Sequence, residues 1–125
     1  MRYTDGLRTP RSLIIICLAA FVFASMPFLT RARAVSTSVR IVNNSSRDIR
    51  NVYTSHVDRN DWSGGLLGGA TIAAGHSSDL SDLACDGQQI KVIAEDQDGC
   101  FLSTVIDCGA SATWTISNDT ARDCD

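Results

Sequence analysis

Four of the five cysteines lie near the C-terminus, at positions 85, 100, 108 and 124, and they constrain the fold more than any other feature. Four cysteines can hold a structural zinc ion or form two disulfides. Zinc sites usually bring their cysteines in pairs that are separated by two to four residues. These cysteines are fifteen, eight and sixteen positions apart. The spacing therefore favours two disulfides, with no metal and no cofactor.

The N-terminus predicts the oxidising compartment that disulfides need. A segment with three arginines precedes the apolar run "SLIIICLAAFVFASMPFL", and Ala32-Arg33-Ala34 forms a small-residue cleavage pattern before Val35. We expect residues 1–34 to be a signal peptide and residues 35–125 to be a single secreted or periplasmic domain. Cleavage after Ala24 is an alternative, and so is an uncleaved membrane anchor. If the leader is cleaved, we expect the chain to contact a membrane only transiently, through the signal peptide.

The charge of the expected mature chain excludes one class of partner. Residues 35–125 contain six basic and thirteen acidic side chains, a net charge of −7. Nucleic acids and anionic membranes attract clusters of lysine and arginine. We therefore expect no nucleic-acid partner.

The pattern of apolar residues predicts an all-β domain. Short β-branched runs alternate with turn residues, and no pattern of helical period extends over a useful length outside the leader. The expected fold is a small antiparallel β-sandwich or partly open barrel, stapled by disulfides, with about six short strands. The expected strands are Val39–Val42, Ile49–Val57, a short strand around Asp79–Leu80, Gln88–Glu95, Cys100–Asp107 and Ala112–Ser117.

The predicted hairpin around "DQDG" suggests how the cysteines pair. If these residues form the turn, Ala94 faces Cys100, and Cys85 and Cys108 close the open end of the same hairpin. The strand Ala112–Ser117 would return antiparallel after "GAS" and bring Cys124 near Cys100. Among three possible connectivities, this favours Cys85–Cys108 with Cys100–Cys124.

A series of landmarks follows in order: "IVNNSS", "IRNVYTSHV", a tryptophan, "LLG", "ATIAAGHSSDLS", "CDGQQIKVIAEDQDG" and "VIDC". This order resembles a family of small secreted or periplasmic bacterial proteins of unknown function, over about Val39 to Cys108. The resemblance implies a β-rich exported domain and a Cys85–Cys108 bridge, and it implies no activity. Ser63 stands where the family usually has glycine, and Cys100 and Cys124 are additions to the common pair.

The stretch "DWSGGLLGG" at positions 61–69 is the most distinctive segment. It lacks the lysine and the following helix of phosphate-binding loops, and acidic residues precede it. We expect a glycine-rich crossover whose apolar residues bury against the sheet. If the protein has a recognition loop, its candidate residues are Asp61, Trp62, Leu66 and Leu67. We expect Trp62 to be partly exposed and Trp114 to lie in the core.

Other polar groups give weaker hypotheses. "EDQDG" offers carboxylates for calcium, but Asp-Gly at a turn is also an ordinary hairpin signal. His56 and "HSSD" at 76–79 contain the residue types of a hydrolase, yet no nucleophile motif accompanies them. We expect both histidines to be surface residues and no catalytic site.

Together these features predict an exported, non-enzymatic domain that binds a protein or a cell-envelope component. A small exported hydrolase and a calcium-stabilised structural domain are the alternatives.

Overall fold

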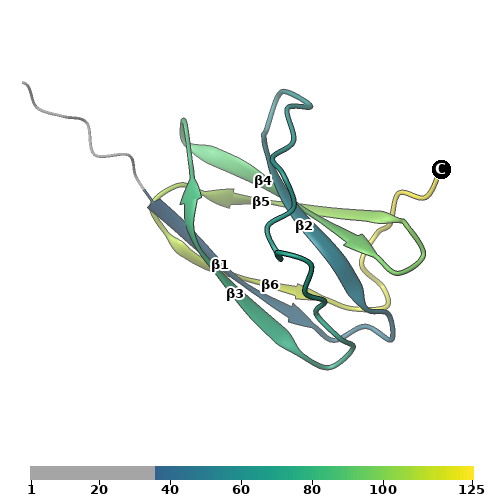
Figure 1. The fold of residues 1–125 in the computed structure, drawn as a ribbon. Helices are drawn as coiled ribbons and strands as arrows, with labels where there is room; N and C mark the ends of the chain where they lie inside the picture. The colour runs from purple at the N-terminus through teal and green to yellow at the C-terminus, as the bar shows by residue number, and fades with distance from the viewer. Residues whose placement is uncertain (1–35) are drawn as a thin grey trace, which may run out of the picture. The chain divides into compact units, whose positions relative to one another are not determined.

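The computed structural model describes residues 36–125, and these form six strands in two three-stranded sheets (Figure 1). The all-β prediction is confirmed. The strands are β1 (Ser36–Asn43), β2 (Ile49–His56), β3 (Ser77–Ala84), β4 (Gln89–Asp96), β5 (Phe101–Asp107) and β6 (Ser111–Ile116). In residues 36–125 no helix is long and apolar enough to span a membrane. The predicted signal peptide and its alternatives fall outside the described residues.

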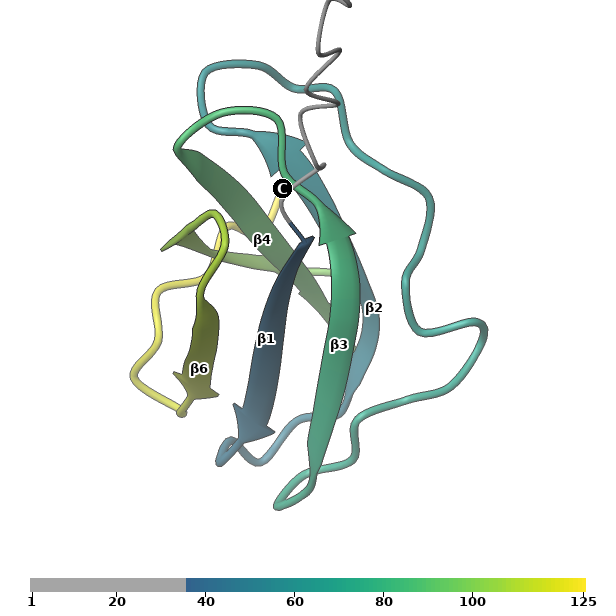
Figure 2. The same ribbon diagram turned by 90° about the vertical axis from the view of Figure 1, so that its left-hand side faces the viewer.

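The two sheets have the strand orders β3-β1-β6 and β2-β4-β5, named here sheet A and sheet B. Figure 2 shows β6, β1 and β3 side by side in one layer. All pairs are antiparallel except β1 and β6, which run parallel. The expectation that β6 returns antiparallel beside β5 is therefore wrong. Instead β6 crosses to the other sheet, where Trp114 lies beside Ile41 and both side chains enter the core.

The core lies between the sheets because alternate residues of each strand face inward. Strand β1 shows the alternation most clearly, with Val39 and Ile41 buried and Arg40 exposed between them. Trp114 is also buried, as predicted. The remaining core residues are Ile49, Val52, Ile72, Leu80, Leu83, Ile90, Val92, Ala94, Leu102, Ile106 and Ile116.

The hairpin of β4 and β5 has a register two positions away from the predicted one. Ala94 pairs with Leu102, not with Cys100. The turn is centred one residue later than expected, on Asp98, where Gly99 adopts a left-handed conformation with φ +80° and Asp96 Oδ1 accepts hydrogen bonds from the amides of Asp98 and Cys100.

The disulfide Cys85–Cys108 is confirmed, but the reason given for it is wrong. In the observed register the amide of Cys108 donates to the carbonyl of Gln88 at 2.9 Å. Cys85 instead follows the last residue of β3, in sheet A. The bridge therefore joins the end of β3 to the end of β5 and fastens the two sheets to each other.

The second predicted disulfide, Cys100–Cys124, is also confirmed. It fastens the C-terminal tail along the outer edge of β5, where Phe101 and Asp123 exchange two backbone hydrogen bonds of 2.8 Å. The tail thus covers one edge of sheet B.

Residues 57–76, which connect β2 to β3, cover the other edge of sheet B. The amides of Ser63 and Leu66 donate to carbonyls of β2 at 2.8 Å, and Ile72 exchanges two hydrogen bonds of 2.9 Å with Ile49. Gly65 lies so close to β2 that a Cβ atom there would be 3.0 Å from Asn51 Oδ1. The glycine-rich segment therefore runs along an edge that would otherwise expose unpaired backbone groups.

Candidate functional site

Three aromatic side chains from three different segments meet on the outer face of sheet B. Tyr53 comes from β2, Phe101 from β5, and Trp62 from the β2–β3 connection. The ring centroids of Tyr53 and Trp62 are 5.5 Å apart. Those of Trp62 and Phe101 are 5.0 Å apart, with the ring planes at 79° in an edge-to-face arrangement. We call these three residues the aromatic platform.

The platform covers an isoleucine that faces away from the core. Strand β4 turns Ile90, Val92 and Ala94 inward, so the alternation places Ile93 on the outer face. Ile93 is nevertheless only 2% exposed. It pairs directly with Tyr53 in the sheet register, next to the ring stack. The outer face of sheet B thus has a small apolar layer of its own.

The platform is open to solvent above this layer. Trp62 is 42% exposed, one of the three exposed large hydrophobic residues among those described. Val105 is another, at 43%, and it lies on the same face of β5 as Phe101. An apolar, aromatic surface on the outside of a sheet is typical of a contact site for a partner.

Glu95 lies at the border of the platform and is half-buried. It pairs with Phe101 across β4 and β5, and its Oε2 accepts a hydrogen bond of 2.9 Å from the Tyr53 hydroxyl. Asn51 donates to the same oxygen at 3.4 Å. Burial raises the pKa of Tyr53, and the hydrogen bond to Glu95 and its negative charge raise it further. Tyr53 is therefore held in its neutral, donating form.

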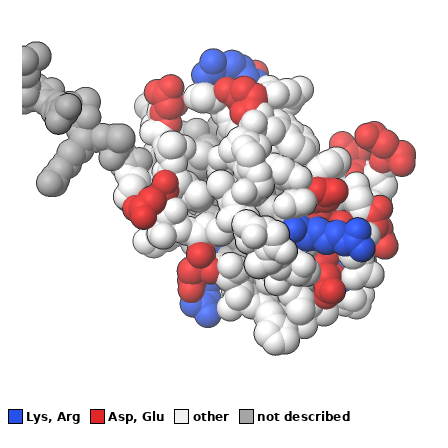
Figure 3. Space-filling view, viewed as in Figure 1, with Lys and Arg blue, Asp and Glu red and all other residues white. Residues whose placement is uncertain are grey.

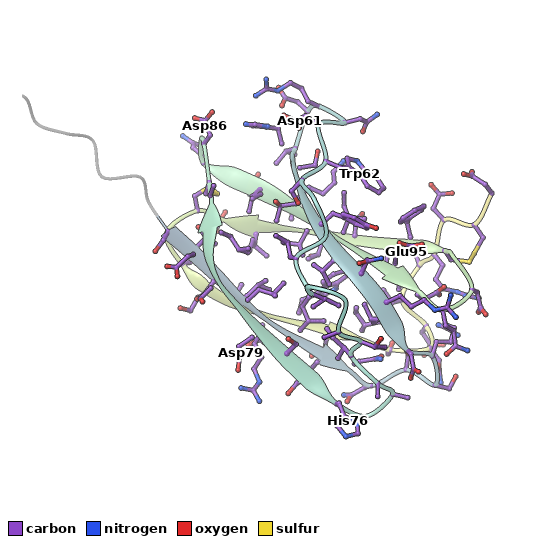
Figure 4. The ribbon with its side chains drawn as sticks, in the orientation of Figure 1. Asp61, Trp62, His76, Asp79, Asp86 and Glu95 are labelled. Atoms are coloured by element: carbon purple, nitrogen blue, oxygen red, sulfur yellow. A yellow bond between two sulfur atoms is a disulfide. The ribbon has the colours of Figure 1, made fainter. Side chains whose placement is uncertain are left out.

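A second polar cluster lies at the end of β2, near the top of Figure 4. The His56 Nδ1 is hydrogen-bonded to Asp61 Oδ2, and its Nε2 is 3.6 Å from Asp86 Oδ2. Asp61 Oδ1 also accepts from the His56 amide at 3.0 Å. Desolvation by itself would raise the pKa of Asp61, but the hydrogen bonds from the His56 amide and ring outweigh it and lower the pKa to about 2. Asp61 is therefore ionised throughout the physiological range.

This cluster borders a pocket where the two sheets separate. Thr54 and Ile90 line it from sheet B, Ala84 lines it from the end of β3, and Asp86 lines it from the β3–β4 connection. The Nε2 atom of His56 is buried and makes no hydrogen bond with the described residues. No serine, threonine or cysteine of residues 36–125 is therefore hydrogen-bonded to the nitrogen that would act as the base of a triad.

The four residues of the predicted recognition loop do not share one environment. Trp62 is exposed in the aromatic platform, as expected. Asp61 is engaged with His56. Leu66 and Leu67 are partly buried and pack against the core. The glycine-rich segment is therefore held to the domain by its two leucines, while its Trp62 side chain stays exposed.

The other polar groups considered from the sequence are widely separated. His76 is exposed just before β3, and Asp79 forms an ion pair with Arg40 at 3.3 Å. Figure 4 shows His76 at the opposite end of the molecule from Asp61. The expectation that His56 is a simple surface residue is wrong, because its ring lies between Asp61 and Asp86. The histidines therefore do not form one site.

The two aspartates of the "EDQDG" turn are paired with arginine side chains. Asp96 is 1% exposed, and its Oδ2 is 2.9 Å from Arg122 Nη1 and 3.4 Å from Arg47 Nε. Arg122 also contacts Asp98 at 3.2 Å. Burial would raise the pKa of Asp96, but hydrogen bonds from Arg122 and from two backbone amides lower it. Arginine groups, rather than a calcium ion, balance the charge here, and residues 36–125 contain no cluster of metal-ligating side chains.

Sequence reasoning missed the contacts of Tyr53 and His56. The alternation of Asn51 and Tyr53 along β2 was a usable signal, since it places both on one face. The partners Glu95 and Asp61 could be found only from the strand register and the path of the connection.

Comparison with known proteins adds one distant likeness. The chain is similar to a solved structure described as "NMR structure of the protein from Eubacterium rectale", with 17% sequence identity and a TM-score of 0.47. The alignment covers 71% of this chain and 84% of that one. No family model matches the chain, and no curated protein matches it either. The fold described above rests on the strands and sheets of this chain alone.

Proposed function

We propose that this protein is an exported, non-enzymatic domain that binds a protein of the cell envelope through its aromatic platform. The observation that carries the proposal is the partial exposure of Trp62 between Tyr53 and Phe101 on the outer face of a sheet. Tryptophan and tyrosine are enriched among the residues that dominate binding energy at protein interfaces. Tyr53 and Phe101 lie on hydrogen-bonded strands of sheet B, which limits the conformational entropy lost when a partner binds.

The disulfides support the location that this proposal requires. Cys85–Cys108 joins the two sheets, and Cys100–Cys124 fastens the tail. Such bridges persist in periplasmic and extracellular environments and are rare in the reducing cytosol.

A small hydrolase is the second candidate, because Asp61 and His56 are arranged like the acid and base of a catalytic triad. The proposal for binding is favoured because His56 Nε2 faces Asp86 rather than a nucleophile. Hydrolysis of a panel of ester and amide substrates by the wild-type protein, lost in His56→Ala, would support the hydrolase and contradict our choice.

Site-specific crosslinking in cells tests the binding surface. A photoreactive amino acid replaces Val105, which lies on the outer face of sheet B, or Thr113, which is exposed on the outer face of sheet A. We expect a crosslinked protein from position 105 and none from position 113. The product should disappear when Trp62→Ala is added, provided that this variant keeps its thermal stability. Equal crosslinking from both positions, or none from position 105, would contradict the proposal.

A further inference from the structure

We propose that the aromatic platform and Glu95 together bind the guanidinium group of an arginine in a basic segment of the partner protein. This inference rests on the proposed function, since it names the chemistry of the partner that docks on the platform. Aromatic rings beside a carboxylate attract cations through the ring faces and through the negative charge. Arginine suits such a site best, because its planar group stacks on rings and pairs with carboxylates.

The contacts of Glu95 leave room for an added cation. Its Oε2 accepts hydrogen bonds from Tyr53 and Asn51, but its Oε1 accepts none from the described residues. No lysine, arginine or histidine of residues 36–125 lies within 4.0 Å of this carboxylate, in contrast to Asp96, which contacts two arginines. Glu95 is thus a half-buried charge without a cationic partner in the described part of the chain.

The aromatic rings adjoin this carboxylate. Phe101 is the direct cross-strand neighbour of Glu95, the Tyr53 hydroxyl donates a hydrogen bond to Glu95, and the Trp62 ring packs between the rings of Tyr53 and Phe101. Figure 4 shows Trp62 and Glu95 on the same side of the molecule. A guanidinium group that pairs with Oε1 is therefore within reach of the rings.

The charge of the molecule favours a basic partner over an acidic one. Residues 36–125 carry thirteen acidic and six basic side chains. The tail residue Asp123 is tied to Phe101 through the backbone, which brings another carboxylate to this end of β5. In Figure 3 acidic side chains are spread over the visible face, and those on the right lie around a basic side chain. The net negative charge of the domain raises the local concentration of cationic segments.

The shape of the site favours a protein side chain over a free small cation. The pockets around His56 and Asp86 and along β1 and Asp79 are lined by neither Glu95 nor a residue of the aromatic platform. Small molecules generally need an enclosed pocket. A side chain presented by a larger interface does not have this requirement.

The test uses the exported protein and a synthetic peptide, acetyl-Arg-Ser-Arg-Ser-Arg-amide. Binding is followed through the two tryptophan indole N–H signals in an NMR titration. Trp62 reports on the platform, and the buried Trp114 is an internal reference. We expect a saturating shift at Trp62 alone. The same peptide with citrulline in place of arginine keeps the shape but lacks the charge, and it should bind at least about fivefold more weakly.

Two charge-matched variants separate a local contact from a general electrostatic effect. Glu95→Gln keeps an acceptor for the Tyr53 hydroxyl and should weaken peptide binding by about fivefold or more. Asp82→Asn removes the same charge from sheet A, at an exposed residue of β3, and should change the affinity less than about twofold. Equal effects of the two variants, equal binding of the citrulline peptide, or a shift at Trp114 would overturn the inference.

Failure of this inference can be distinguished from failure of the proposed function. If position 105 crosslinks a partner in a Trp62-dependent manner but the arginine peptide does not bind, the platform is an interface with a different chemistry. If the peptide binds as expected but no partner crosslinks at position 105, the cation site stands and the proposed partner in the cell envelope is wrong.

Discussion

Replacement of Asp96 by asparagine is the most direct test of how the turn and the tail are held together. In Asp96→Asn the remaining oxygen still accepts from the amides of Asp98 and Cys100, so the turn keeps its hydrogen bonds. The loss is confined to the charge facing Arg122 at 2.9 Å and Arg47 at 3.4 Å. Removing one partner of a buried ion pair costs about 3–5 kcal/mol.

The lower end of that range applies here because the two arginines respond differently. Arg122 is partly exposed and keeps its contact with Asp98 at 3.2 Å. Water and the Asp98 carboxylate therefore still stabilise the charge of Arg122 after Asp96 is replaced. Arg47 is only 16% exposed in its side chain, and its Nη2 already lacks a hydrogen-bond partner among the described residues. We therefore expect Asp96→Asn to lower the free energy of unfolding by about 3 kcal/mol. For a domain of this size that corresponds to a Tm roughly 15 °C lower.

The assay is equilibrium unfolding in urea and by heat at pH 7, on protein exported to a bacterial periplasm. Mass spectrometry confirms that both disulfides are intact in each sample. Asp98→Asn is the matched control, because Asp98 is half-exposed and shares Arg122. We expect this control to cost less than about 1 kcal/mol. A loss below about 1 kcal/mol in Asp96→Asn, or equal losses in the two variants, would refute the reasoning.

Further predictions concern a buried amide, an ion pair, a strained residue and the leader. Asn43 is fully buried, and its side chain joins Ser45, Arg47 and Ile72 through four hydrogen bonds. Asn43→Ala should therefore lower the free energy of unfolding in urea by about 3 kcal/mol. A loss no larger than that of the exposed Asn44→Ala would contradict this prediction. The folded pKa of Asp61, about 2, lies below the ~3.9 of an unfolded aspartate. Its stabilising effect is therefore complete above about pH 4 and lost as the pH falls toward 2, and Asp61→Asn should flatten the decline of Tm over that range; an unchanged profile would count against the His56 contact. Asp82 has φ +57° beside a register shift in the pairing of β1 and β3. Asp82→Val should lower the free energy of unfolding by about 1–2 kcal/mol although the site is exposed, whereas Asp82→Asn should leave it unchanged. Equal stability of the two variants would rule out backbone strain at this residue. The intact mass of the exported protein should match a chain that begins at Val35. A mass that includes the leader would show that the cleavage prediction is wrong.

The disulfide pairing shows how a correct prediction can rest on an incorrect geometry. The hairpin argument paired Cys85 with Cys108 through an assumed register, and the true register differs by two positions. The error arose because the position of the turn depends on the left-handed conformation of Gly99 and on the hydrogen bonds that the Asp96 side chain accepts, which the pattern of apolar residues does not report. The bridge forms nonetheless, because the end of β3 and the end of β5 lie at the same end of the sandwich.

The sequence by itself determined the number and approximate position of the strands and the burial of Trp114. These properties follow from local alternation of apolar and polar residues, which depends on the two-residue period of a strand. Only the tertiary structure decided that β6 runs parallel to β1, that Tyr53 donates a hydrogen bond to Glu95, and that Asp61 turns toward His56. Such contacts join residues that are distant in the chain or lie across an irregular loop. They depend on which strands become neighbours and in which register, and no local pattern of side chains specifies that choice.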